Sequence, residues 1–278
     1  MSVKASGAKY DIFTKIALAL VIFIIGFLII LPLINILIYS TQPSGSAIIT
    51  GAFSDVVTRN IIWNTVKLGL TVAALGTVLG FIMAYAQARL EFRGKKVLHI
   101  INLIPIISPP FAFATAIIVL FGRSGMITRG VFDWRPTLYG FPGLVLVLTL
   151  SFFPIAYMNL LGMLRSLDPA LDEAGSSLGA NKARIFRTVT LPLLIPGFAG
   201  SFLLLFIESI ADLANPIIIG GNYTVLASRA YMAINGDYDI SLAAGYSSLL
   251  LLPALLVFLV QRYWAQKKSV VSVTGKPS

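Results

Sequence analysis

Long apolar runs alternate with short polar connections along nearly the whole chain. Six of these runs reach about twenty residues or more, the length that a helix needs to cross roughly 30 Å of hydrocarbon. They cover residues 16–39, 63–88, 97–121, 138–164, 191–211 and 240–263. Because a backbone in lipid must satisfy its own hydrogen bonds, runs of this length predict an all-α membrane protein with six transmembrane helices.

The composition agrees with a membrane location. Of the 278 residues, 57% are hydrophobic and 12% are charged, whereas soluble domains have about a quarter of their residues charged. The absence of cysteine excludes disulfides and cysteine-ligated metal sites. The first run, 16–39, is longer than the core of a cleavable signal peptide, so we expect it to remain as a transmembrane helix.

The net charge is +10, and the positive side chains are concentrated in the connections on one side of the predicted membrane. This bias explains the basic composition without a nucleic-acid partner. Cytoplasmic connections carry an excess of Lys and Arg. Both termini are therefore predicted to be cytoplasmic, with 1–15 as the N-terminal segment, 16–263 as the transmembrane domain and 264–278 as a tail or linker. The predicted cytoplasmic side holds Lys4, Lys9, Lys15, Arg89, Arg93, Lys95, Lys96, Arg165, Lys182, Arg184, Arg187, Arg262, Lys267, Lys268 and Lys276. The opposite side holds Arg59, Arg123, Arg129, Arg135 and Arg229.

Two of the predicted spans contain local features that affect packing. In the second span, Gly69, Ala73, Gly76 and Gly80 fall on one helical face, which predicts a surface where another helix approaches closely. In the third span, the stretch "PIISPP" predicts a kink or a break. A break would suit a water-filled cavity, whereas a kink would need only neighbouring helices to shield it.

A polar passage, "LDPALDEAGSSLGANKARIFRTVTLPLLIPG", separates the fourth and fifth spans. Asp168 and Pro169 predict a helix start, and Leu171, Ala174 and Leu178 form an apolar stripe on that helix. Gly179 then permits a bend before a second, basic helix that leads into the next span. Two short helices of this kind suit docking into a groove of another protein, and equally suit lying on lipid.

The same passage resembles the EAA loop of permeases from binding-protein-dependent ABC importers. Glu173, Ala174, Gly179, Leu191 and Pro192 match the family pattern at its spacing. Gly175 stands where the pattern has its second alanine, and Val189 where it has isoleucine. The resemblance implies the type I importer permease fold and a coupling loop, residues 165–190, that is seated on a separate ATPase. The residues implied to make this contact are Asp172, Glu173, Ala174, Gly175, Leu178, Gly179, Leu191 and Pro192.

The resemblance also implies the partners of the chain. No G-x-x-x-x-G-K-[ST] phosphate-binding loop occurs in the sequence, so ATP and magnesium are expected on the partner ATPase, and this chain is expected to have no cofactor or catalytic residue. Two ATP-binding subunits, a periplasmic substrate-binding protein and a second permease half, homologous, identical or fused, would complete an inner-membrane importer. The tail "KKSVVSVTGKPS" resembles the linker of double-length permeases.

Candidate residues for the substrate pathway lie mainly at the end of the fifth span. Glu208 and Asp212 are four residues apart, and an ionisable group at membrane depth usually faces a cavity or pathway. The alternative is an interfacial pair that meets water or Arg229. Asn215 follows them, and Ser108 in the proline-rich stretch is the fourth candidate.

The passage around Glu208 resembles the permeases of ferric-iron-type importers, on the residues Glu208, Asp212, Asn215, Pro216, Gly220, Gly221 and the stretch "TVLASRAY". This resemblance implies ferric iron as the cargo, with a phosphorylated sugar, a phosphonate, a polyamine or another small solute as alternatives. Carboxylates suit a hard cation, but two of them do not define a metal site. A different class, an ion-coupled secondary transporter, would use Glu208 and Asp212 to bind coupling ions.

Overall fold

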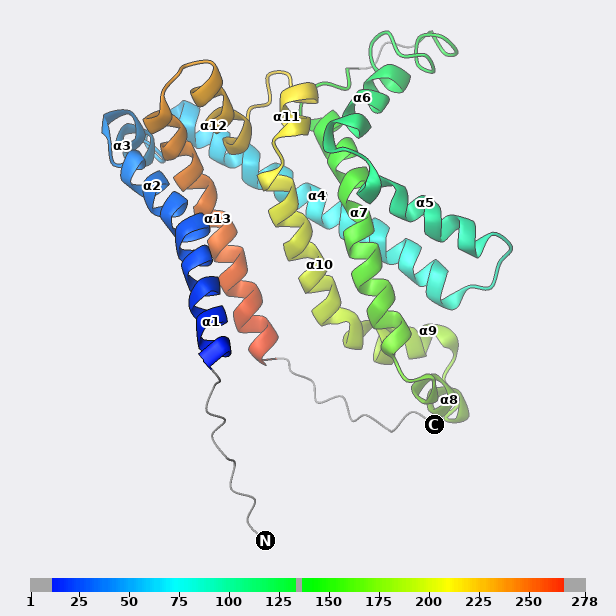
Figure 1. Ribbon diagram of the computed structural model, residues 1–278. Coiled ribbons are helices and arrows are strands. Elements are labelled where there is room, and N and C mark those ends of the chain that lie inside the picture. Colours follow the sequence, from blue (N-terminus) through cyan, green and yellow to red (C-terminus); the bar gives the residue numbers. More distant parts are fainter. Residues whose placement is uncertain (1–11, 134–136, 268–278) are drawn as a thin grey trace.

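The computed structural model describes residues 12–133 and 137–267, without the side chains of Pro110 and 264–267. Residues 1–11 and 268–278, which form most of the predicted terminal segments, lie outside this part, as does Arg135. The described residues form helices and connecting turns, with no strand among them. The helices are α1 (Ile12–Ile25), α2 (Leu31–Ser40), α3 (Pro43–Thr50), α4 (Val56–Arg89), α5 (Lys95–Ile107), α6 (Pro110–Phe121), α7 (Phe141–Ser166), α8 (Pro169–Ser177), α9 (Lys182–Ile185), α10 (Leu191–Ala211), α11 (Ala214–Ile219), α12 (Leu226–Asn235) and α13 (Ile240–Lys267). Figure 1 shows their arrangement.

Five of the helical stretches are long and apolar enough to span a membrane. Single π-helical turns, Gly26–Ile30 and Phe186–Thr190, join α1 to α2 and α9 to α10 without breaking the spans. The spans are Ile12–Ser40, Val56–Arg89, Phe141–Ser166, Lys182–Ala211 and Ile240–Tyr263. The sequence therefore predicted all five, although it placed several of their ends a few residues away.

The remaining predicted span, the third one at 97–121, is divided rather than continuous. α5 and α6 meet at an angle of 110°, which confirms the break among the two outcomes expected from "PIISPP". Ser108 and Pro109 have the extended ψ values of 138° and 142°, because a residue that precedes proline is driven out of the helical region. Pro105, in contrast, is accommodated within α5.

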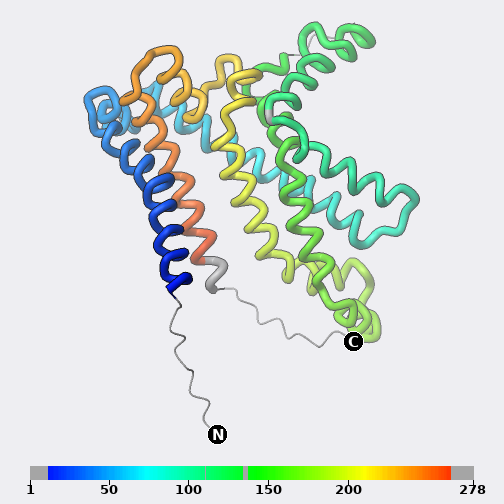
Figure 2. Tube along the Cα trace, in the orientation of Figure 1, coloured from blue at the N-terminus to red at the C-terminus, as the bar shows by residue number. Residues whose placement is uncertain are grey.

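α4, α7 and α10 pack together at the centre, and α13 lies beside α2, α3 and α12 (Figures 1 and 2). The apolar core between α4, α6, α7 and the segment after α10 consists of Leu68, Val72, Ala114, Ile117, Leu144, Val147, Leu148, Ile219 and Val225. Polar helices α8 and α9 lie at one end of this bundle, and α3, α11 and α12 lie at the other.

The small-residue face predicted for the second span is confirmed as a packing surface. A Cβ atom on Gly80 would lie 2.7 Å from Cβ of Ala156 and 2.8 Å from the backbone nitrogen of Tyr157. One on Gly69 would lie 2.6 Å from Cγ2 of Ile210, and one on Gly76 would collide with Leu205. Glycine thus lets α4 approach the backbone of α7 and the side chains of α10 closely.

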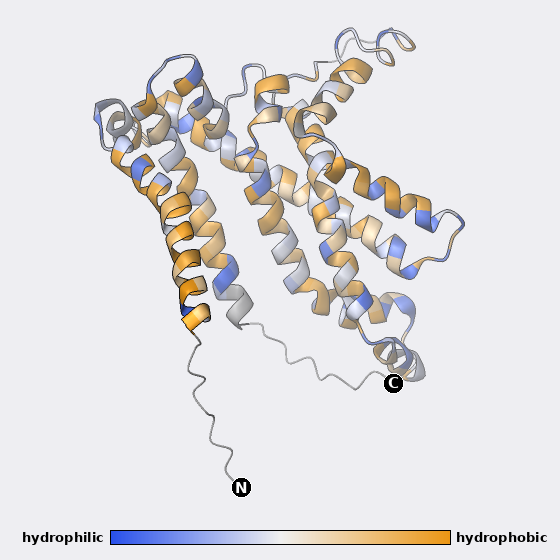
Figure 3. Ribbon diagram, in the orientation of Figure 1, coloured by the Kyte–Doolittle hydropathy of each residue, from blue (hydrophilic) through white to orange (hydrophobic). Residues whose placement is uncertain are grey.

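The first span has no such partners along most of its length. α1 contains no buried residue, and in α2 only Ser40 is buried. Its residues are almost all apolar, and Figure 3 shows a mostly hydrophobic surface on the side in view. A helix that is hydrophobic on every side is typical of contact with lipid or with another membrane helix.

Candidate functional site

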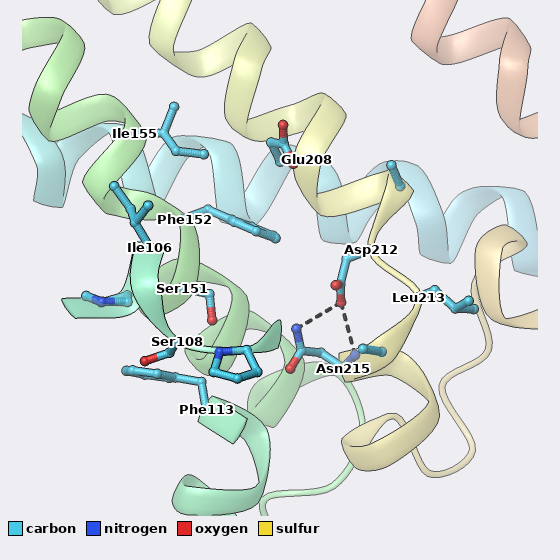
Figure 4. A pocket seen from close by; sticks show the side chains of 14 residues that line it. Ile106, Ser108, Phe113, Ser151, Phe152, Ile155, Glu208, Asp212, Leu213 and Asn215 are labelled. Carbon is cyan, nitrogen blue, oxygen red and sulfur yellow. Dashed lines mark hydrogen bonds between the residues drawn. The ribbon is translucent and has the colours of Figure 1, made fainter. Parts of the chain in front are cut away.

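A cavity of about 500 Å³ lies beside the break between α5 and α6 (Figure 4). All four candidate residues for the substrate pathway line it: Ser108, Glu208, Asp212 and Asn215. The remaining lining is mostly apolar and comes from the α5–α6 bend, α7 and the α10–α11 connection: Pro105, Ile106, Pro109, Phe113, Ser151, Phe152, Ile155, Ala211, Leu213 and Ala214. The break in the third span therefore lines a cavity, which agrees with the expectation of a break and not with that of a shielded kink.

The two carboxylates reach this cavity in different ways. Glu208 lies in the last turn of α10, which ends at Ala211. Asp212 has an extended ψ of 127°, and its Oδ2 accepts hydrogen bonds from the backbone N–H of Asn215 at 3.1 Å and from Nδ2 of Asn215 at 2.9 Å. Asp212 thus caps α11 and does not continue the helical face of Glu208, so the prediction of one shared helical face is wrong in this detail.

Arg229 does not neutralise this pair. Its guanidinium binds Asp237 at 2.7 Å instead. The alternative in which Glu208 and Asp212 pair with Arg229 is therefore wrong. Both carboxylates face a cavity that is otherwise largely apolar, where few other groups compete for a bound positive charge.

Oxygen atoms predominate among the polar groups of the cavity wall. Oδ1 of Asn215 and Oγ of Ser151 are buried without a hydrogen-bond partner, whereas Oγ of Ser108 donates to the backbone oxygen of Ile104 at 3.2 Å. Carboxylate, amide and hydroxyl oxygens are donors that suit hard cations. Among the described residues no three His, Asp or Glu side chains come together as a metal site, so a cation here would keep other ligands.

The polar passage between α7 and α10 forms the bent helix pair that the sequence predicts. Oδ1 of Asp168 accepts from the backbone N–H of Ala170 at 2.9 Å and caps α8. Gly179 follows with a φ of +79°, a left-handed conformation that glycine adopts without strain. Oδ1 of Asn181 then accepts from the N–H of Arg184 at 2.9 Å and caps α9.

One side of this passage is attached to the bundle. Asp172 forms an ion pair with Arg89 at the end of α4. Gly175 faces Ile185 so closely that a Cβ atom would lie 2.9 Å from Cγ1 of Ile185. The space between α4 and the passage leaves a second cavity of about 290 Å³, which Arg89, Asp172 and Lys182 help to line.

The other side of the passage is open. Leu171 is 43% exposed and Leu178 is 88% exposed. Glu173 and Ala174 are exposed too, as are Leu191 and Pro192 at the start of α10. The residues expected to meet an ATPase thus lie on an accessible surface, except for Asp172 and Gly175, which face the bundle.

The model of one protein family, the binding-protein-dependent transport system inner membrane component, matches residues 76–270. The chain belongs to this family. This permease chain is 34% identical over 269 residues to the ferric transport system permease protein FbpB of Actinobacillus pleuropneumoniae, a match that covers 94% of this chain and 39% of that protein. It is also 28% identical to the molybdenum transport system permease protein ModB of Escherichia coli K12, over 73% of this chain and 93% of that protein.

Solved permease structures share the fold. A bacterial ABC transporter involved in the import of alginate superposes with a TM-score of 0.72 at 16% identity, over 92% of this chain and 96% of that one. The MetNI methionine ABC transporter superposes with a TM-score of 0.61 at 18% identity, over 74% of this chain and 94% of that one. The predicted ABC importer permease fold is therefore confirmed.

Two features of the permease were not predicted from the sequence. The unpaired hydroxyl of Ser151 lies in the middle of an apolar span, and only its polarity distinguished it from its neighbours. The pairing of Arg89 with Asp172 joins positions 83 residues apart. Ser151 therefore has a weak signal in the sequence, and the Arg89–Asp172 pair has none.

Proposed function

We propose that this permease forms half of the membrane pathway of an ATP-driven importer, with the α8–α9 segment docked on a separate ATPase. The observation that carries this proposal is the capped, bent helix pair whose outer side exposes Leu171, Glu173 and Leu178. An apolar helix surface of this kind suits a groove in another protein. In this arrangement ATP and magnesium are held by the partner, and this chain performs no chemistry itself.

The orientation follows from charge. Of the Lys and Arg residues outside the membrane whose side chains the structure describes, ten lie toward the α8–α9 end and four toward the α11–α12 end. By the positive-inside rule, this distribution supports the proposal that α8, α9 and both ends of the described chain lie on the cytoplasmic side of the inner membrane. The first set is Lys15, Arg89, Arg93, Lys95, Lys96, Arg165, Lys182, Arg184, Arg187 and Arg262, and the second is Arg59, Arg123, Arg129 and Arg229.

A complete importer requires further parts. The chain spans about two fifths of the length of the ferric transport relatives that it matches. A second permease half, either a separate chain or a fused one, would complete the pathway, and two ATP-binding subunits and a periplasmic binding protein would drive and supply it.

Ferric iron is the cargo that we propose. Two relatives at 33–34% identity are ferric transport permeases, and the cavity combines two carboxylates with amide and hydroxyl oxygens. Uptake of radioactive ferric iron by proteoliposomes that contain the assembled importer and its binding protein tests the proposal. ATP-dependent uptake is expected; uptake driven by a proton or sodium gradient without ATP would instead establish a secondary transporter.

Removing the carboxylate charges is expected to slow iron uptake. Glu208→Gln and Asp212→Asn keep the shape of each side chain but remove a negative charge from the cavity, so we expect uptake to fall about tenfold or more, equivalent to ~1.4 kcal/mol. Glu91→Gln is the matched control, because Glu91 lies at the other end of the bundle with its side chain 93% exposed. Wild-type uptake by both cavity variants would show that iron takes another route.

A further inference from the structure

α4 differs from the other spans in its length and its lack of interruptions. It has 34 residues, which corresponds to ~51 Å at 1.5 Å per residue. Among the spans of the described residues, it alone contains no proline. Its start is capped by Asp55, which accepts from the N–H of Thr58 at 2.7 Å, and hydrogen bonds from the side chain and backbone of Thr58 lower the pKa of Asp55. Sharp kinks in helices arise mostly at prolines and π-bulges, and α4 has neither, so it can move as one piece.

The C-terminal end of α4 is fastened to the α8–α9 segment by two kinds of contact. Arg89 forms its ion pair with Asp172 of α8. One turn earlier, the ring of Tyr85 meets the ring of Phe186 edge-on at a centroid distance of 5.4 Å, and Phe81 lies 6.2 Å from the same ring. These contacts join α4 to both arms of the bent segment.

The N-terminal part of α4 holds the segment 223–226, which connects α11 to α12 and includes Leu226, the first residue of α12. Nδ2 of Asn64 donates to the backbone oxygen of Thr224 at 3.1 Å, and the hydroxyl of Tyr223 donates to the backbone oxygen of Asn64 at 2.9 Å. The N–H of Leu226 donates to Oγ1 of Thr65 at 2.8 Å. Burial raises the pKa of Tyr223 to about 12, so its hydroxyl remains a donor at physiological pH.

The segment that α4 holds is linked directly to the cavity. The first turn of α11 contains Asn215, whose backbone N–H donates to Asp212, and α11 ends four residues before Tyr223. The ring of Tyr223 also contacts the ring of Phe141 in a tilted arrangement, with the ring centroids 5.2 Å apart, and the ammonium group of Lys67 lies 4.5 Å from the centroid of Phe141. A shift of α4 along its axis would therefore move the 223–226 segment and the adjoining wall of the cavity.

We propose that α4 acts as a rigid rod that carries movement of the ATPase-docked α8 across the membrane to the 223–226 segment. Arg89 and Asp172 are its positioning residues at the cytoplasmic end, and Asn64 and Tyr223 at the far end. This inference rests on the proposed function, because it requires that α8 is moved by an ATPase.

The experiment uses the absence of cysteine from the chain. A single reporter, Asn222→Cys, is placed in the assembled importer at an exposed position beside the 223–226 segment. Its reaction rate with a membrane-impermeant maleimide is measured with and without ATP. We expect Arg89→Asp and Asp172→Arg to reduce the ATP-dependent change in rate about threefold or more, and the double variant to restore it.

A second variant tests the far end without touching the coupling loop. Tyr223→Phe removes one hydroxyl, and it should reduce the response of the reporter while ATP hydrolysis and ATPase binding stay at wild-type levels. An unchanged response of the reporter in Tyr223→Phe, or in Arg89→Asp with the ATPase still bound, would contradict the proposal that α4 transmits the movement of α8. Failure of the unaltered chain to bind any ATPase would instead refute the proposed function.

Discussion

Replacing Leu178 with aspartate is expected to release the ATPase and abolish transport while leaving the permease folded in the membrane. Leu178 is 88% exposed and packs on little of its own chain, so the substitution costs the isolated fold almost nothing. In the docked complex the same change buries a charge against an apolar groove, which is costly. Co-purification of the ATPase should weaken about tenfold or more, equivalent to ~1.4 kcal/mol.

Tyr238→Asp is the matched control for this variant. Tyr238 is 86% exposed at the opposite end of the bundle, with a φ of +55° that aspartate tolerates. It receives the same charge in a similarly open position, and it should retain the ATPase. If Leu178→Asp and Tyr238→Asp retained the ATPase equally well, the exposed side of α8 would have no role in coupling.

Adding one methyl group to Gly80 is expected to destabilise the bundle markedly. In Gly80→Ala the new Cβ would lie 2.8 Å from the backbone nitrogen of Tyr157 and 2.7 Å from Cβ of Ala156. Backbone atoms cannot turn away as a flexible side chain would, so α4 and α7 must separate. Overpacking of this kind costs about 1–3 kcal/mol, and we expect a lower midpoint of thermal unfolding in detergent.

The control is the same substitution at a glycine with no neighbour. Gly162 lies within α7, and a Cβ atom there would meet nothing within 4 Å. Gly162→Ala should raise the unfolding midpoint, because alanine stabilises a helix interior by up to about 1 kcal/mol relative to glycine. Opposite signs at the two glycines are the expected result. A gain in stability at both would show that α4 and α7 are not in close contact at Gly80.

The features predicted correctly from the sequence depend on short stretches of chain. Hydrocarbon thickness determines the span lengths, the Ser108–Pro110 stretch forces the break, and the glycine spacing on α4 forms a packing face. The cap by Asp168 and the bend at Gly179 are local in the same sense, since each acts on residues close by in the chain.

The features that were missed or misplaced depend on tertiary structure or on competing local choices. Asp212 was placed on the helical face of Glu208 because the two residues are four positions apart, a spacing that puts them on one face only if the helix continues through both. In the structure Asn215 donates two hydrogen bonds to Asp212. Asp212 therefore caps α11, and α10 ends before it. The Arg89–Asp172 pair depends on how α4 crosses the bundle, which no local pattern reveals.

The isolation of the leading helix has a consequence for engineering. α1 buries no residue, whereas α2 packs beside α13, where Oγ of Ser241 donates to the backbone oxygen of Tyr39. The stretch that matches the family model starts only at residue 76, inside α4. Among the described residues, none from the first span lines the cavity beside the α5–α6 break. A chimera that takes this span from a permease for another cargo should therefore keep its cargo preference unchanged.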